Sequence, residues 1–309
     1  MVRWFCSLVV VGVTAVPAVC ADEGVVAVDE VGLVNYQAVP IADPVGGDQF
    51  KGSNFIHPLK TPSGFTITDS QPEDHLHHFG VWWPWKHIEV DERQILCWEL
   101  QQGDGLIEAK DHKRIRHGLV TSSLYIDRKA DGGPVSRLAE TTVITTSPLL
   151  TRPARGYYLD IMINERTARD ETVTVTPYRY SGFSIRCTSF WRNHNSSLLT
   201  SEGKSQVGSN FTEARWVLIQ GATDQGDSAG SPQAGVLLMS HPSNQSHPEL
   251  LRTWENAHDG IHFVNFNTVQ KDPWIFEPGN NYQRRYRLFV FDGEITPAEA
   301  DGMWQRYSD

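Results

Sequence analysis

The stretch YYLDIMIN, residues 157–164, decides the fold class. Leu159, Ile161 and Ile163 recur at every second position, so in an extended chain they share one face. Such runs, short and rich in β-branched and aromatic residues, are typical of strands. The same character recurs in TTVITT (141–146), ETVTVTPYRY (171–180), RWVLIQG (215–221), AGVLLMS (234–240), IHFVNFN (261–267) and YRLFVFDG (286–293). The sequence is therefore predicted to be all-β.

Turn-forming clusters separate these segments, as in ADGGP (130–134) and EPGNN (277–281). They are spread evenly and mark no domain boundary, so residues 22–309 are predicted to form one large antiparallel β-sandwich. A short C-terminal helix is the exception. Thr296 is a suitable N-cap, Pro297 suits the first helical position and Glu299 completes a capping box.

The first 21 residues have the layout of a secretory signal peptide: Arg3, an apolar run, then Pro17 and small residues. Cleavage is expected after Ala21, with Ala18 as the alternative, and Cys20 leaves lipidation open. The apolar run is shorter than the roughly 20 residues that span a bilayer. No later segment is apolar enough to do so. An exported protein, periplasmic or extracellular, is the expectation.

Charge and cysteine content narrow the partners. The chain has 27 basic and 37 acidic residues, a formal charge of -10. Nucleic acid and anionic membranes are disfavoured because both need a positive patch, whereas a neutral or cationic ligand fits better. Beyond the signal region only Cys97 and Cys187 remain. An exported protein could join them in a disulfide or bury them as free thiols, and both readings stay open.

Histidines are concentrated in EDHLHHFGVWWPW, residues 73–85. If this segment is a strand, His75 and His77 share one face and His78 points to the other. Three interpretations remain open. His75 and His77 could be ligands of one divalent transition metal such as copper, zinc or iron, with Glu73, Asp74 or a distant carboxylate completing the site. All three histidines could instead act as acids or bases without metal, or they could stabilise a structural turn.

Aromatic residues follow the histidines at once. On a strand, Trp83 and Trp85 would share one face and Trp82 would lie on the other. A tryptophan face beside polar groups is suited to stacking on a sugar ring, although tryptophans also fill ordinary cores. Trp83 or Trp85 is therefore predicted to provide a stacking wall for a carbohydrate.

Several further residues are candidates for the same site. His57, Tyr180 and Arg186 are expected to position a substrate, with the arginine fork binding a carboxylate or a pair of hydroxyls. Ser181 lacks the surrounding GxSxG elbow of a nucleophile. The acidic partner in catalysis is left between Glu99, in CWEL, and Glu165, which follows YYLDIMIN.

The landmarks HPLKTPSGFTIT, DHLHHFGVWWPWKHIEV, CWEL, YSGFSIR, HPSN and PGNNYQRRYRLFVFDGE occur in this order. They resemble a bacterial domain family, common in planctomycetes, that is recorded as a domain of unknown function and often labelled "methane oxygenase" (PmoA-like). A membrane-embedded monooxygenase subunit would need apolar spans that this chain lacks. Strand content and length instead look like the galactose mutarotase-type supersandwich, which implies sugar binding and proton transfer by His and acidic side chains.

The preferred functional prediction is an exported protein that binds or processes a small or polymeric carbohydrate. An enzymatic activity would be that of a glycoside hydrolase, lyase or epimerase. A metal-dependent oxidoreductase or hydrolase that uses His75 and His77 is one alternative. A sugar-binding module without catalytic activity is the other.

Overall fold

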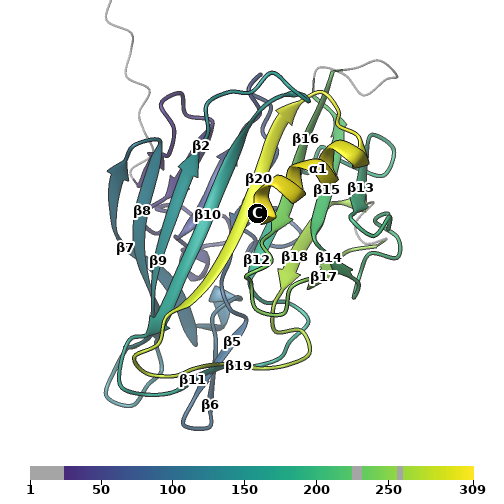
Figure 1. Cartoon of the computed structure of the whole chain (residues 1–309). Helices are drawn as coiled ribbons and strands as arrows, with labels where there is room; N and C mark the ends of the chain where they lie inside the picture. The colour runs from purple at the N-terminus through teal and green to yellow at the C-terminus, as the bar shows by residue number, and fades with distance from the viewer. Residues whose placement is uncertain (1–23, 225–231, 256–259) are drawn as a thin grey trace, which may run out of the picture.

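The structure is a computed structural model that describes residues 24–224, 232–255 and 260–309 (Figure 1). It is mostly β, with three antiparallel sheets that form a sandwich and one helix at the C-terminal end. This confirms the predicted fold class. The expected signal peptide, residues 1–21, lies outside the described residues.

The first sheet contains the long strands in the front of Figure 1. The segment YYLDIMIN lies at its centre, in β10, where Leu159 pairs with Leu288 on one side and with Thr146 on the other. Leu159, Ile161 and Ile163 are each no more than 1% exposed, which confirms their predicted inward face. In spatial order the strands are β13 (Ser196–Thr200), β15 (Trp216–Ala222), β16 (Gln233–Ser240), β20 (Tyr282–Asp292), β10 (Arg155–Thr167), β9 (Val135–Thr146), β8 (Gly118–Asp127) and β7 (Gly105–Ile115).

The second sheet packs against the first through the largest hydrophobic core, which includes Ile56, Val81, Ile185 and Val264. Its other face carries a separate aromatic cluster that includes Trp82 and Phe263. Val81 and Trp82 are neighbours in β4 and belong to different cores, so both faces of this sheet are covered. The strands in order are β1 (Val25–Ala27), β2 (Val34–Gln37), β3 (Phe55–Leu59), β4 (Val81–Trp82), β12 (Phe183–Arg186), β18 (Phe263–Asn267), β17 (Glu249–Thr253) and β14 (Glu213–Ala214).

The third sheet lies at the lower end of the molecule in Figure 1 and has its own hydrophobic core. Its strands are β19 (Trp274–Phe276), β11 (Val173–Val175), β5 (His87–Val90) and β6 (Arg93–Leu96). The strand expected over 171–180 is therefore confined to its first part, because Pro177 has no N–H to continue a ladder. Within the described residues, two short 3-10 helices lie in the loops, η1 (Asp48–Phe50) and η2 (Leu100–Gln102).

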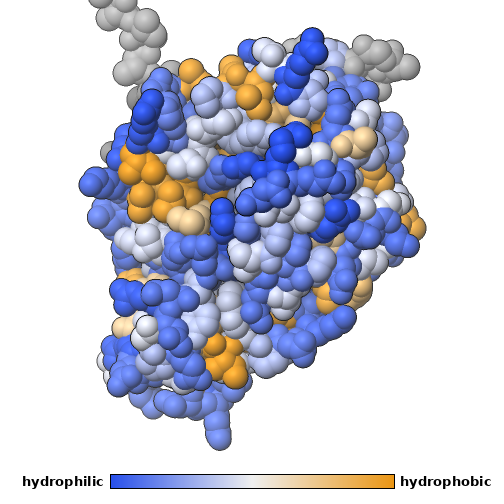
Figure 2. Space-filling model, in the orientation of Figure 1, coloured by the Kyte–Doolittle hydropathy of each residue, from blue (hydrophilic) through white to orange (hydrophobic). Residues whose placement is uncertain are grey.

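The C-terminal helix α1 (Pro297–Ser308) begins with the predicted capping box. The Glu299 backbone N–H donates to Thr296 Oγ1 at 3.3 Å, and the Thr296 N–H donates to a Glu299 carboxylate oxygen at 2.7 Å. Ala300, Met303 and Tyr307 bury one face of the helix against the outer side of the first sheet (Figure 1). This face of the molecule is mainly hydrophilic, with separate small hydrophobic patches (Figure 2).

Cys97 and Cys187 are both free and buried, in two different cores. Of the two alternatives for these cysteines, the structure therefore shows free thiols. Within the described part of the chain, no helix is long and apolar enough to cross a membrane.

Candidate functional site

The histidine segment forms a turn between β3 and β4, not a strand. Ser70 and Phe79 form an antiparallel bridge, and Gln71 and His78 are joined by a 2.7 Å backbone hydrogen bond. Inside this loop the His75 N–H donates to the Pro72 carbonyl, and the His78 N–H donates to the His75 carbonyl. The predicted strand alternation of the histidines is therefore wrong, because consecutive turns bring all three imidazole rings together.

Gly80 lets this turn return to the second sheet. Its φ of +59° lies in the left-handed region that favours glycine. A Cβ at this position would lie 2.3 Å from the Ile56 carbonyl oxygen on the neighbouring strand β3. Backbone atoms cannot yield as a flexible side chain can, so the close approach of the turn to β3 requires glycine.

The three imidazoles contact one another. The ring centroids of His75 and His78 are 4.7 Å apart, and those of His77 and His78 are 4.9 Å apart. His78 is only 1% exposed; its ring stacks on Phe263, with centroids 5.1 Å apart, and is tilted against Trp82, with centroids 5.0 Å apart. His78 thus forms the base of the cluster on the aromatic outer face of the second sheet, while His75 and His77 remain partly accessible.

A surface pocket with a volume of about 150 Å³ lies at these histidines. Its walls come from the histidine turn, the segment after β6, the segment before β12 and the residue that follows β17. Four segments far apart in sequence therefore converge on one small cavity. The lining residues are His75, His77, His78, Trp98, Glu99, Arg179, Tyr180 and Trp254.

Asp74 orients His75 through a hydrogen-bonded chain. Arg186 Nη2 donates to Asp74 Oδ1 at 2.7 Å, and His75 Nδ1 lies 2.9 Å from Asp74 Oδ2. Burial opposes ionisation of Asp74, but its bonds to Arg186 and His75 outweigh this and lower its pKa below the usual range. An ionised carboxylate only accepts, so Nδ1 must carry the proton of His75. In the neutral imidazole Nε2 is then a proton acceptor.

His77 is held in its neutral form. Burial lowers its pKa to about 4, with nearby Lys86 and His75 acting in the same direction and Glu99 opposing them. Near neutral pH the imidazole therefore has a lone pair, which can accept a hydrogen bond or a proton.

Glu99 presents a carboxylate oxygen at the pocket. Lys86, whose side chain is only 5% exposed, donates from Nζ to Glu99 Oε1. The ammonium also lies over the Tyr178 ring, 5.0 Å from its centroid. Glu99 Oε2 is buried and has no hydrogen-bond partner within the described residues. One oxygen is thus fixed by Lys86, and the other is an acceptor that no described residue uses.

Tyr180 supplies a donor. Its hydroxyl oxygen accepts a hydrogen bond from Arg252 Nη2 at 3.1 Å and another from Trp254 Nε1 at 3.2 Å. Both lone pairs of the oxygen are used by these bonds, so its own O–H is left to donate. The pocket therefore combines acceptors on His77 and Glu99 with a donor on Tyr180.

The structure places the predicted substrate-positioning residues differently. Tyr180 lines the pocket, and Arg186 lies behind it, fully buried and 5.2 Å from the Trp254 ring centroid. His57 does not line it. Its Nδ1 lies 2.9 Å from Thr68 Oγ1 on the β3 side, and burial lowers its pKa to about 4. His57, which was predicted to position a substrate, therefore lies outside this pocket.

The expected stacking wall of Trp83 or Trp85 is wrong. Both side chains are 0% exposed and lie in two different cores. Trp83 Nε1 donates to Glu140 Oε1 at 2.8 Å, and Trp85 Nε1 donates to Glu165 Oε1 at 2.8 Å. Strand alternation correctly placed Trp82 and Trp83 on opposite faces of the second sheet. It could not predict their exposure, because both faces of that sheet are covered.

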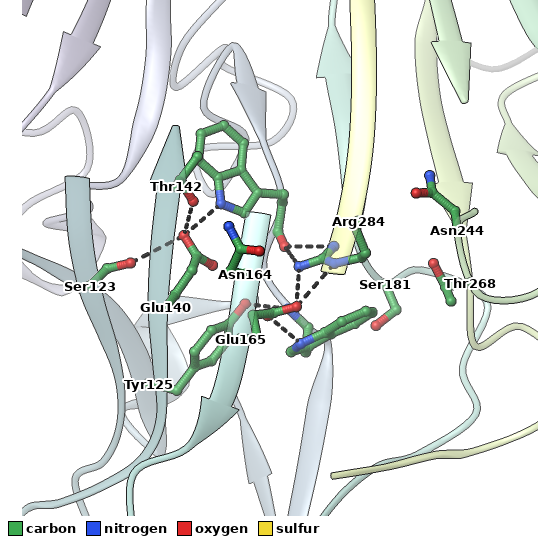
Figure 3. Close-up of polar contacts among 12 residues, drawn as sticks. Ser123, Tyr125, Glu140, Thr142, Asn164, Glu165, Ser181, Asn244, Thr268 and Arg284 are labelled. Carbon is green, nitrogen blue, oxygen red and sulfur yellow. Dashed lines mark hydrogen bonds and ion pairs between the residues drawn. The ribbon is translucent and has the colours of Figure 1, made fainter. Parts of the chain in front are cut away.

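Glu165 is also outside the pocket. It lies in the interior with Arg284, whose Nη2 is 3.0 Å from Glu165 Oε2 (Figure 3). Both side chains are 0% exposed. Burial raises the pKa of Glu165 to about 7, although Arg284 opposes the rise. Of the two predicted acidic partners, the structure therefore places Glu99 with the histidines, and Glu165 in a separate buried network.

The pocket also contains residues that the sequence did not single out: Trp98, Arg179 and Trp254. Trp98 directly precedes Glu99 and Arg179 directly precedes Tyr180, so adjacency to a candidate was the available signal for both. Trp254 follows β17 and reaches the histidines through tertiary structure alone. Its ring centroid lies 4.6 Å from that of His75.

Metal ligation by His75 and His77 stays a prediction. Their ring centroids are 5.5 Å apart. Over residues 24–224, 232–255 and 260–309, no group of three or more His, Cys, Asp or Glu side chains is arranged to hold a metal ion. Asp74, the carboxylate nearest in sequence, is already bound by Arg186.

Comparisons with known proteins give the family but not the activity. No curated protein matches the chain. A solved structure from human microbiome, provisionally described as a kojibiose phosphorylase, is similar with a TM-score of 0.39 and 10% identity. The similarity covers 89% of this chain and 32% of that one, so the chain spans about a third of the length of the matched structure. A family match over residues 24–305 shows that the chain belongs to the family of unknown function DUF6807.

Proposed function

We propose that the pocket around His75 and His77 binds a carbohydrate and catalyses proton transfer on it. The observation that carries the proposal is the convergence of acceptors, a donor and aromatic rings in one small cavity. Pockets for small polar ligands typically combine apolar walls with a few fixed polar groups. Here Trp98 and Trp254 provide the apolar part, and His77, Glu99 and Tyr180 provide the polar part.

Hydroxyl groups match this lining. A sugar hydroxyl both donates and accepts, so it can donate to His77 or to the Glu99 carboxylate while accepting from Tyr180. Trp98 and Trp254 are 3% and 5% exposed, so each shows only a small part of its ring to a ligand. The pocket volume of about 150 Å³ is well below the roughly 300–1,000 Å³ of sites for drug-sized ligands. This favours one sugar ring, either free or at the end of a chain.

The available bases favour histidine chemistry over a carboxylate pair. Glycoside hydrolysis ordinarily uses two carboxyl groups that flank the scissile bond. Among the described lining residues, Glu99 is the only carboxylate, and Asp74 behind them is held ionised by Arg186. His75 and His77 both line the pocket, and imidazole is the side chain most often used for proton transfer. Epimerase- or lyase-type proton transfer is therefore the reaction class that we propose.

A solvent-exchange experiment tests the proposal. The purified chain is incubated in D₂O with a panel of monosaccharides and short oligosaccharides, and carbon-bound deuterium and new products are followed by NMR. Exchange or product that disappears in His77→Gln supports the proposal. Binding without exchange in any sugar would show a binding module, whereas absence of both would contradict the sugar assignment.

The metal alternative has its own measurement. Metal content is measured by inductively coupled plasma mass spectrometry on protein purified without an affinity tag or chelator. About one equivalent of a transition metal, lost in His77→Ala, would favour the metal-dependent alternative over metal-free proton transfer.

A further inference from the structure

The charges around the pocket do not cancel. Lys86 is paired with Glu99, and Arg186 is paired with Asp74. These two pairs are locally neutral. Any further charge at the pocket therefore decides the sign that a ligand meets.

Two further arginines lie against Tyr180, one of them in the pocket lining. Arg179 lines the pocket, and its guanidinium carbon is 5.4 Å from the Tyr180 ring centroid. The Arg252 guanidinium carbon is 4.9 Å from the same centroid. Neither arginine forms an ion pair with a carboxylate of the described residues. In a chain of formal charge -10, this side of the pocket is locally positive.

The hydrogen-bonding groups around Tyr180 are also mainly donors, which suit a negatively charged ligand. Arg252 uses Nη1 on the Thr253 carbonyl and Nη2 on the Tyr180 hydroxyl, and its buried Nε has no partner among the described residues. The Tyr180 O–H is left to donate, and Arg179 carries donors only. Arg179 and Tyr180 therefore offer hydrogen-bond donors at the pocket, and Arg252 adds its positive charge beside Tyr180.

We infer that the ligand is an acidic sugar, whose carboxylate binds beside Tyr180 and Arg179. This inference rests on the proposed function, and it narrows the substrate to the uronic acid class. A carboxylate accepts at both oxygens and matches the donor fork of a guanidinium. Glu99 does not oppose it strongly, because Lys86 neutralises that carboxylate. The hydroxyls of the same ring then remain for His77 and the Glu99 carboxylate. The overall negative charge had favoured a neutral or cationic ligand, and the local charge points the other way.

Isothermal titration calorimetry with matched ligands tests the inference. D-Glucuronate, D-galacturonate and D-mannuronate are each compared with their methyl esters and with the parent hexoses, and glucose 6-phosphate serves as a second anion. At least one uronate is expected to bind about tenfold or more tightly than its ester, the usual scale for a hydrogen bond to a charged group. Arg179→Gln is expected to remove that preference. Arg166→Gln changes the same charge at an exposed site on β10 and is expected to preserve it.

The outcomes separate the inference from the function beneath it. Equal binding of uronates and their esters, or tighter binding of glucose 6-phosphate, would overturn the uronate assignment and leave sugar binding intact. An Arg179→Gln variant that weakens uronate and ester equally would likewise overturn it. If no member of the panel binds, the proposed function fails and the uronate assignment fails with it.

Discussion

Arg186 and Asp74 lie 112 positions apart in sequence and form a 2.7 Å hydrogen bond between Nη2 and Oδ1. The arginine is fully buried in β12, and the aspartate belongs to the histidine turn between β3 and β4. This bond anchors the turn to the second sheet. Asp74 also lies within hydrogen-bond distance of His75 Nδ1. The carboxylate that Arg186 holds in place therefore sets the tautomer of this pocket histidine.

Asp74→Asn is expected to destabilise the fold by roughly 1–3 kcal/mol, since it leaves the buried Arg186 without a counter-charge. Breaking a fully buried pair costs about 3–5 kcal/mol, and the 22% exposure of Asp74 reduces this. Urea unfolding measures the change. Asp43→Asn, at an exposed site, is the control and is expected to have little effect.

The stability difference between wild type and Asp74→Asn is predicted to depend on pH. The folded pKa of Asp74 is lowered below the unfolded value of about 3.9. Its contribution is therefore complete above about pH 4 and is lost as the pH falls through the folded pKa. The stability difference between wild type and Asp74→Asn should narrow in strong acid. A difference that stays constant down to pH 2 would contradict the ionised Asp74.

The lowered pKa of His77 predicts that stability depends on pH over a second, higher range. Its folded pKa is about 4, whereas an unfolded histidine has a pKa of about 6.5. Between these values the unfolded state binds more protons, so the free energy of unfolding falls as the pH decreases from 6.5 to 4, by up to about 1.4 kcal/mol per unit. His77→Gln should remove that component of the slope, while His112→Gln, on the exposed part of β7, should retain it. An NMR titration that gives His77 a pKa near 6.5 would contradict the account.

Substitutions of Glu99 and Glu165 are predicted to have opposite effects on ligand affinity and on stability. Glu165→Ala should cost about 3–5 kcal/mol of stability, because Arg284 is left buried and unpaired. Its folded fraction should still bind a ligand at the pocket. Glu99→Gln should lose ligand affinity with a smaller change in stability, because its side chain is 23% exposed. Urea unfolding and calorimetric titration of both variants check this, and a Glu165 variant that folds fully without binding would reverse the assignment.

Gly80→Ala should destabilise the protein by more than about 1 kcal/mol, since it adds both a positive-φ penalty and a backbone clash with Ile56. Gly64→Ala provides the matched control. Gly64 also has a positive φ, of +96°, but a Cβ added there would meet no neighbouring atom within 4 Å. A φ of +96° is at least as unfavourable for alanine as one of +59°, so an excess loss in Gly80→Ala over Gly64→Ala is due to the clash. Equal or smaller losses would show that the turn relaxes away from β3.

The fold could be predicted from the sequence because its signals are local. Leu159, Ile161 and Ile163 alternate along β10, and one face of the first sheet fills the core. The capping box of Thr296 and Glu299 is equally local, with its partners three residues apart. Neither feature depends on knowing which distant segment packs nearby.

The site could be predicted only in part, because its geometry depends on tertiary contacts. Strand alternation failed for HLHH since Pro72 and Gly80 enclose a turn, and Gln71 has a φ of +52°. Trp83 or Trp85 was predicted to form a stacking wall for a sugar, yet both are 0% exposed. Trp254 reaches the histidines from the position after β17, far along the chain, and no local pattern marks that approach. The signal peptide and export stay predictions.

The most direct test of the central claim is calorimetric titration of the tightest-binding sugar from the panel into wild type, His77→Gln and His112→Gln. The account predicts an affinity loss of about tenfold or more in His77→Gln, the scale of a lost bond within a buried polar site, and no change in His112→Gln. Equal affinity in all three proteins, or no sugar that binds wild type, would contradict the assignment of the histidine pocket as a carbohydrate site.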